Sequence, residues 1–367
     1  MSLALAEMRR RPGRFAFAVG ALTLLVVLLL LLGGLLDGLY RGSTGALRAQ
    51  DADLLVLAAR SRDSLLRSVV TPAERRRVTG VPGVRAVRGL GVALVGVAVP
   101  GRPEPADGAV IGYEGGVRGV PLPPGPNEAW VDRRLAAQGV RVGQRLLLGR
   151  GRVPVRVRGF VSDTSYLLQG GIWVRPGTWR RVLAGNRPDA ALGPREVQGL
   201  AVRTEPGVED VAVAAGIRRA TAGRLRALSV ADAVAALPGV QAQNATFTGI
   251  IAVTFVVAGL VVGLFFALVT LERTPLYGVL KALGASSGQL VTGVCTQAVV
   301  TAGVAYGLGS LAALALVGVA PASIPVELRP GRAGVILGGL LLASLAGSLV
   351  SLRRLLRIDP AAVIGGA

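Results

Sequence analysis

The sequence contains no histidine, a single cysteine and a single lysine, Lys281. The missing histidine excludes serine triads built on imidazole and zinc sites with histidine ligands. The lone Cys295 excludes an internal disulfide. A P-loop needs a lysine between glycine and serine or threonine, whereas Lys281 lies between Leu280 and Ala282. If ATP drives this protein, another chain binds it, and no cofactor or metal site is expected here.

Aromatic residues are also scarce, at 4% of the chain. That content does not favour the stacking surfaces of single-strand nucleic-acid binding, so no nucleic-acid partner is expected. The 41 basic residues, all arginine except Lys281, outnumber 21 acidic ones, and coding bias is the simplest interpretation of the arginine excess. The chain is 51% hydrophobic with a mean hydropathy of +0.57. These averages are typical of a membrane protein with a sizeable polar part.

Long apolar runs predict four transmembrane helices, at 15–36, 247–271, 290–319 and 333–352. The run from Phe15 to Leu36 carries no charge and is long enough to cross a hydrocarbon core of roughly 30 Å. A cleaved signal peptide is the alternative, but its apolar region is usually about 7–15 residues long, which favours an uncleaved anchor. No charged residue lies in the middle of any run, which argues against an ion-coupled carrier or an ion pore.

Arginines are concentrated at both ends of the chain, in a basic amphipathic lead over residues 1–14 and at Arg353, Arg354 and Arg357. The positive-inside rule then predicts that both termini are cytoplasmic in a multi-pass protein of the cell membrane. Four spans place residues 37–246 and the loop 320–332 outside. They place the loop 272–289 and the tail 353–367 inside.

Small residues four apart recur within three of the spans and predict close helix packing in lipid. The pairs are Gly259 and Gly263, Gly303 and Gly307, Ala343 and Gly347, and Ser344 and Ser348. With 52 glycines in the chain, chance spacing remains the alternative for any one pair.

The outer segment, residues 37–246, has the size of an ordinary domain. Thr71-Pro-Ala-Glu74 is a capping box with proline at the first helical position, and it predicts a helix to Val78. The stretch 100–126, rich in proline and glycine, indicates a long loop or an insertion. Strands are predicted at 51–58, 84–99, 199–204 and 225–230, helices at 208–221 and 231–237, and strand, short helix, strand, strand over 128–160. This pattern predicts a mixed α/β unit from about 45–99 and 196–240, with a β-rich insertion at about 100–195.

One polar cluster in this segment, Asp163-Thr-Ser-Tyr166 near Gln169, could suggest catalysis outside the membrane. It lacks the spacing of a nucleophile with its base, and no histidine is available to it. We therefore expect no catalytic residue in this chain.

The stretch between the second and third spans predicts a short amphipathic helix over 275–283. Thr274 is a suitable N-cap, Pro275 fits the first helical position, and Gly284 fits the C-terminal cap. Apolar residues recur at i, i+3, i+4 and i+7: Leu276, Val279, Leu280 and Leu283. The alternative is a connector that lies on the inner leaflet.

The same stretch carries a family resemblance. Glu272-Arg-Thr and Tyr277-Gly-Val-Leu-Lys-Ala-Leu-Gly-Ala-Ser286 resemble the loop of FtsX/MacB-like permeases of ABC transporters, although the usual acidic residue before the aliphatic–glycine pair is absent. The tail Arg353-Arg-Leu-Leu-Arg-Ile-Asp-Pro-Ala-Ala362 resembles the closing motif of that family. The segment 129–146 resembles its external domain, and Ile324-Pro-Val-Glu327 looks like the DevC-type exporters within the MacB-like branch.

The resemblance implies an α-helical membrane protein with four spans and a ferredoxin-like external α/β domain that carries a β-rich insertion. It implies docking of the short helix on a separate ATPase dimer, and a homodimer of this chain. The residues implied in docking are Glu272, Arg273, Pro275, Leu276, Val279, Leu280, Lys281, Leu283 and Gly284.

Three functions stay open: export of a hydrophobic or envelope-associated substrate, for which a periplasmic adaptor is a candidate partner; signalling to an envelope (cell-wall) enzyme; and a membrane scaffold. The size of the outer segment favours export. Besides membrane lipid, the ATPase is the partner that the resemblance implies for the first two.

Overall fold

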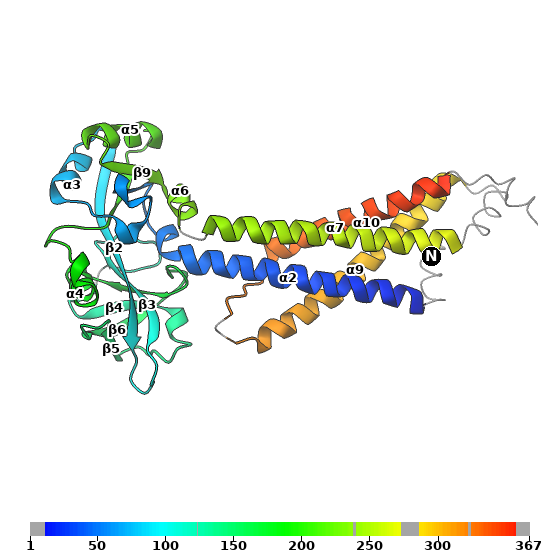
Figure 1. The fold of residues 1–367 in the computed structure, drawn as a ribbon, viewed down its shortest axis with the longest axis horizontal. Helices are drawn as coiled ribbons and strands as arrows, with labels where there is room; N and C mark the ends of the chain where they lie inside the picture. The colour runs from blue at the N-terminus through cyan, green and yellow to red at the C-terminus, as the bar shows by residue number, and fades with distance from the viewer. Residues whose placement is uncertain (1–11, 123, 238–239, 273–285, 322–323, 357–367) are drawn as a thin grey trace, which may run out of the picture. The chain divides into compact units, whose positions relative to one another are not determined.

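The computed structural model describes residues 12–122, 124–237, 240–272, 286–321 and 324–356 (Figure 1). The chain divides into two compact units. The helical unit comprises Met1–Gly38 and Asn244–Ala367, and the α/β unit comprises Leu39–Gln243. Each unit has its own hydrophobic core.

Four long helices have the length and composition to cross a membrane. They are α2 (Pro12–Arg48), α7 (Val240–Glu272), α9 (Ser287–Val319) and α10 (Pro330–Leu356). All four contribute to the core of the helical unit, where Val26 of α2, Phe266 of α7, Ala302 of α9 and Leu340 of α10 are buried in one cluster. The predicted architecture of four spans is confirmed.

Helix α2 is longer than the apolar run that predicted it. The run ends at Leu36, but the helix continues to Arg48, the last twelve residues being more polar. Local hydrogen bonds support this extension, because the Thr44 hydroxyl donates to the Tyr40 carbonyl and the Arg48 guanidinium donates to the Thr44 hydroxyl. Hydropathy locates the apolar part of such a helix and not its end.

The α/β unit contains the predicted ferredoxin-like arrangement. Its elements follow the order β1 (Leu54–Ala58), α3 (Pro72–Thr79), β2 (Val84–Ala98), β8 (Gly199–Thr204), α5 (Asp210–Ala220) and β9 (Leu225–Ser229). The strands pair antiparallel in the order β9-β1-β8-β2. Alternate β1 residues serve two cores: Leu54 and Val56 join the cluster that includes α3 and α5, whereas Leu55 and Leu57 join the cluster of the opposite face.

The predicted capping box of α3 is confirmed. The Glu74 N–H donates to the Thr71 hydroxyl at 3.3 Å, and the Thr71 N–H donates to the Glu74 carboxylate at 3.0 Å. These two bonds satisfy donors that a helix start otherwise leaves open.

The β-rich insertion is not a separate layer, because it shares strand β2 with the ferredoxin-like part. Its strands are β3 (Ala106–Tyr113), β4 (Glu128–Asp132), β5 (Arg145–Leu148), β6 (Val153–Val161) and β7 (Gly170–Val174). They pair in the order β3-β7-β4-β6-β5-β2, and β3 also pairs with β2, so the ladder closes on itself. The first half of β2 pairs with β8 and its second half belongs to this barrel.

Two parts of the insertion differ from the sequence prediction. The stretch 100–126 is not one long loop, because it contains β3. Strand β7 and helix α4 (Pro176–Asn186) were not predicted at all. Glycines obscure the strand pattern in β3 and β7, and at these sites neighbouring side chains or backbone leave no room for a Cβ atom.

Trp179 on α4 explains two of these glycines. Gly91 of β2 and Gly112 of β3 lie opposite each other in the ladder. A Cβ atom at Gly91 would lie 2.1 Å from the Trp179 ring, and one at Gly112 would lie 2.7 Å from the Trp179 Cβ. The fully buried indole of Trp179 therefore packs directly on this cross-strand glycine pair, and this contact joins α4 to the barrel.

We expect Gly91→Ala to destabilise the full-length protein by about 1–3 kcal/mol, because the added methyl group would overlap the Trp179 ring. Gly177→Ala on the same helix as Trp179 is the matched control, since nothing lies within 4 Å of that site. Thermal unfolding in detergent measures both, and equal midpoints for the two variants would contradict this role of Gly91.

Candidate functional site

Most of the predicted docking helix lies outside the described residues, which stop at Glu272 and resume at Ser286. This applies to Arg273, Pro275, Leu276, Val279, Leu280, Lys281, Leu283 and Gly284. Glu272 is exposed and is the last residue of α7. On the other side, Ser286 and Gln289 form a capping box that starts α9, with reciprocal hydrogen bonds of 3.1 and 3.2 Å. The start of the helix after the loop is thus defined by its own residues.

Gly259 and Gly263 of α7 lie against α10. A Cβ atom at Gly259 would lie 3.5 Å from the Ala343 carbonyl oxygen, and one at Gly263 would lie 3.3 Å from the Gly347 carbonyl oxygen. The tightest approach is at Gly347, whose added Cβ would lie 2.4 Å from the Gly259 carbonyl oxygen. One turn towards the N-terminus of each helix, the Phe255 ring covers Gly339. The two helices therefore approach through small residues spaced four apart on both sides.

Gly303 and Gly307 make no comparable contact within the described chain. Both are exposed on α9, and nothing lies within 4 Å of a Cβ atom added at either site. The close approach on this helix is instead at Gly309, where an added Cβ would lie 2.6 Å from a Val26 methyl group of α2. Gly309 also has small residues four positions away on both sides, because Ala305 and Ala313 are buried in the same core. The spacing rule therefore applies to α9, but in a different register from the predicted pair.

Charged residues at the ends of the spans form a contact that sequence reasoning missed. Arg332 at the start of α10 donates two hydrogen bonds, at 2.6 and 2.7 Å, to the Asp37 carboxylate of α2. Beside this pair, the Glu327 N–H donates to the Gly34 carbonyl at 2.9 Å, and Gly38 lies directly under the Pro325 carbonyl. The segment 324–332 thus packs across α2, at glycines that allow the backbones to touch.

In the α/β unit, Asp163 binds two arginines near the end of α2. Its carboxylate accepts hydrogen bonds of 2.6 Å from both Arg41 and Arg48. Burial by itself would raise the pKa of Asp163, but the hydrogen bonds and positive charges of the two guanidinium groups outweigh it and lower that pKa. The neighbouring Leu167 and Leu168 N–H groups donate to the Ser43 and Gly42 carbonyls of the helix.

The polar cluster at 163–166 is therefore structural in its observed contacts. Thr164 donates through its N–H and its hydroxyl to the Asp132 carboxylate, at 2.8 and 2.7 Å. Tyr166 is buried in the core that also contains the end of α2. Among the described residues, no group of three histidine, cysteine, aspartate or glutamate side chains is placed to hold a metal ion.

A second half-buried ion pair ties the two parts of the α/β unit together. Arg75 of α3 donates hydrogen bonds of 2.9 and 2.7 Å to Glu114, which follows β3, and the Gly89 N–H of β2 donates to the same carboxylate. Burial would raise the pKa of Glu114, but these bonds and the charges of Arg75 and Arg180 lower it below its ordinary value.

A model of the MacB-like periplasmic core domain matches residues 15–220, and a model of the FtsX-like permease C-terminal region matches residues 248–360. An ABC transporter permease of unassigned function from Mycobacterium tuberculosis is 28% identical to this chain over 99% of both chains.

Two further similarities are weaker. A putative hemin transport system permease protein, HrtB, of Staphylococcus epidermidis is 18% identical over 100% of this chain and 99% of its own length. The extracellular domain of the ABC-type transporter YknZ from Gram-positive bacteria matches 48% of this chain and 99% of its own, with 14% identity and a TM-score of 0.34.

The close approach of α7 and α10 predicts that Gly347→Leu destabilises the full-length protein by about 1–3 kcal/mol, because backbone atoms occupy the space of the new side chain. Gly303→Leu is the matched control, since it adds the same side chain to a span where nothing lies within 4 Å. Thermal unfolding in detergent should give a lower midpoint for Gly347→Leu than for Gly303→Leu. Equal decreases in midpoint would show that the α7–α10 contact does not require glycine at position 347.

The lowered pKa values of Asp163 and Glu114 predict acid sensitivity. In acid the unfolded chain binds more protons at these groups than the folded chain does, so stability falls as pH falls. Their contribution is fully present above their ordinary pKa values of 3.8 and 4.5 and is lost as pH drops through the lowered values. We expect the thermal midpoint to decrease as the pH falls below about 5.

The double variant Asp163→Asn and Glu114→Gln tests this origin. It should be less stable than the native chain near neutral pH and should show a smaller decrease in acid. If its midpoint falls as steeply as that of the native chain, other groups cause the acid sensitivity.

Proposed function

The chain belongs to the FtsX/MacB-like family of ABC transporter permeases, and we propose that it couples ATP hydrolysis by a separate ATPase to motion of its α/β unit. The observation that carries this proposal is the pair of family models, which match in chain order and cover both units. No P-loop occurs in the sequence, which supports a partner as the source of ATP hydrolysis.

The coupling step is assigned to the helix predicted over residues 275–283. Its apolar residues would enter a groove of the ATPase, while Glu272, Arg273 and Lys281 at the rim would set the register. The stretch follows α7 directly and precedes α9, so a displacement there acts on two spans at once. Gly259 and Gly263, which lie against α10, would pass that displacement to a third.

Helix α2 supports transmission to the α/β unit. It is one continuous helix that begins in the helical unit and ends in the α/β unit. In the helical unit it is tied by Asp37 to Arg332, and in the α/β unit by Arg41 and Arg48 to Asp163. A helix fixed by side chains in both units can carry motion without a path for ions through the bilayer.

Two ATPase subunits closing on ATP would need two docking helices, so the working form is proposed to be a homodimer. Gly303 and Gly307, which face open space on α9, are available to pack against the second copy or lipid. The arginine distribution supports cytoplasmic termini in the cytoplasmic membrane and an α/β unit on the outer side.

Export is the favoured activity, with a hydrophobic or envelope-associated substrate. One full-length relative carries the name of a putative hemin transport system permease, which favours transport. Signalling to an envelope enzyme is the alternative, because the same coupling would move the α/β unit against a partner. A periplasmic adaptor would fit the first activity and a cell-wall hydrolase the second.

Leu280→Asp should abolish co-purification of the cognate ATPase with the full-length chain, because a charge would enter the apolar contact. Gly278→Asp is the matched control, since helical spacing places residue 278 opposite the four apolar residues. ATPase retained by Leu280→Asp, or lost equally from both variants, would count against docking through this face.

A further inference from the structure

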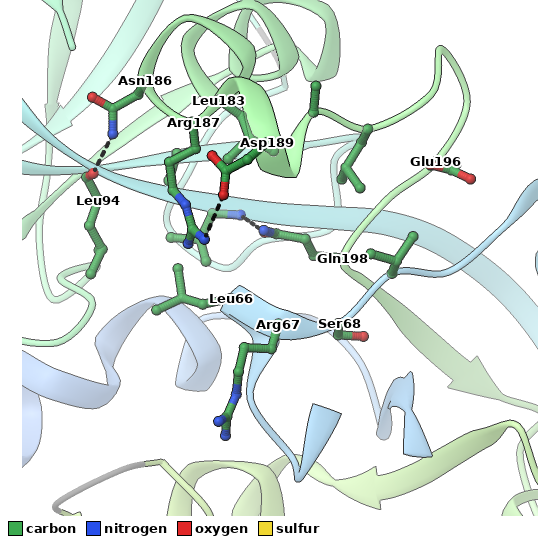
Figure 2. Close-up of a pocket in the computed structure, with 15 residues that line it drawn as sticks. Leu66, Arg67, Ser68, Leu94, Leu183, Asn186, Arg187, Asp189, Glu196 and Gln198 are labelled. Atoms are coloured by element: carbon green, nitrogen blue, oxygen red, sulfur yellow. Dashed lines mark hydrogen bonds and ion pairs between the residues drawn. The ribbon is translucent and has the colours of Figure 1, made fainter. Parts of the chain in front are cut away.

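A cavity of about 530 Å³ lies within the α/β unit, where the ferredoxin-like part meets the barrel. Figure 2 shows its two sides. Leu183 and Asn186 of α4 and the following Arg187 form one side, and Leu66, Arg67 and Ser68, from the segment before α3, form the other. Between them runs β2, with Val92, Ala93 and Leu94 in the lining. A cavity of this size suits a small ligand or a short peptide segment.

The floor of the cavity is a gap in the strand ladder. On this side of β2, pairing with β8 stops at Leu90, and pairing with β5 resumes at Val97. The opposite side of β2 is paired with β3 throughout this stretch. The gap arises because one strand serves two sheets that diverge, and it leaves the central part of β2 without a neighbour.

Two side chains fill part of the gap. The Val92 N–H donates to the Gln198 side chain at 2.5 Å, and the Leu94 carbonyl accepts a hydrogen bond of 3.4 Å from the Asn186 amide. These bonds show that residues 92 and 94 both direct their main-chain groups into the gap. The Val92 carbonyl and the Leu94 N–H therefore face the cavity, and no described residue pairs with them on that side.

A carbonyl at one position and an N–H two residues later form the pattern that a parallel strand neighbour completes. One residue of a parallel strand, lying opposite Ala93, would donate its N–H to Val92 and accept from Leu94. Gln198 and Asn186 could keep their present bonds. We propose that this cavity binds an extended peptide segment of a partner protein, which lies parallel to β2 and pairs with it through one residue.

The residues that line the cavity indicate which side chains the peptide would carry. Successive residues of a strand point to opposite faces. The residue opposite Ala93 would point towards Leu183 and Leu192, which share a core with Ala93. Its two neighbours would point towards the other wall, formed by Leu66, Arg67 and Val69.

The charged residues of the lining further restrict the peptide side chains. Arg187 is within 3.6 Å of Asp189, whereas Arg67 is exposed and makes no ion pair among the described residues. Glu196, the other acidic residue of the lining, accepts a hydrogen bond from the Gly193 N–H. Arg67 is thus the charged group placed to attract the ligand, which we infer is an apolar residue flanked by one apolar and one acidic residue. Such a segment belongs to a protein partner of the α/β unit, whether an adaptor or an envelope enzyme. The site does not depend on the ATPase contact, so a failure of one leaves the other intact.

The test uses the full-length protein in detergent and two capped, fluorescently labelled pentapeptides, Thr-Val-Leu-Asp-Thr and Thr-Asp-Leu-Val-Thr. Each is compared with a copy that is N-methylated at leucine, which removes the central donor. Fluorescence anisotropy measures binding up to about 1 mM peptide. Val69→Trp places a large side chain in the cavity, and Val211→Trp is the matched control, because Val211 is an exposed residue of α5 outside it.

We expect at least one peptide to bind the native chain and Val211→Trp equally. Binding should weaken about tenfold or more on N-methylation and with Val69→Trp, since each removes a contact of the paired residue. Arg67→Glu should weaken the same peptide but not its asparagine analogue. Absence of saturable binding by both peptides, or equal binding to Val69→Trp and native chain, would overturn the site. Equal binding of the N-methylated copy would overturn the strand pairing.

Discussion

Helix α2 belongs to both units, and three of its charged residues are held by partners from distant parts of the chain. Asp37 pairs with Arg332, while Arg41 and Arg48 share Asp163. Half-buried ion pairs of this kind contribute little net stability, because desolvation offsets much of their attraction. Their geometry is specific, however, since each arginine meets a carboxylate along fixed directions. The pairs therefore set the register of α2 within each unit, on which its proposed role as a mechanical link depends.

Close backbone approach at glycine is a second constraint, and it acts in both units for different reasons. In the helical unit, Gly263 and Gly347 let two helices gain contact where lipid offers no hydrophobic driving force. In the α/β unit, Gly91 and Gly112 make room for one large indole in a core that excludes water. The sequence shows these glycines equally, but only the partner across the contact explains each one.

The long strand β2 determines the architecture of the α/β unit. Its first half completes the ferredoxin-like sheet and its second half closes the barrel. A strand shared in this way must lose its neighbour where the two sheets separate. Gln198 and Asn186 satisfy part of the exposed ladder, and the remaining main-chain groups face the cavity. The candidate peptide site is thus a consequence of the topology, with Arg67 and the apolar walls giving it a preference.

The sequence by itself determined the features that depend on neighbouring residues. Hydrophobic runs located the four spans, Thr71 and Glu74 defined the start of α3, and the motif at 272–286 identified the family. The sequence pattern did not predict the end of α2 or the strands β3 and β7, because polar residues or glycines interrupt the local pattern there. Only the tertiary structure paired Asp163 with two arginines of α2, replaced Gly303 by Gly309 as the contact of α9, and opened the ladder beside Ala93. Each of these depends on atoms far apart in the chain, and local periodicity carries no information about which distant residue fills the space beside a given backbone.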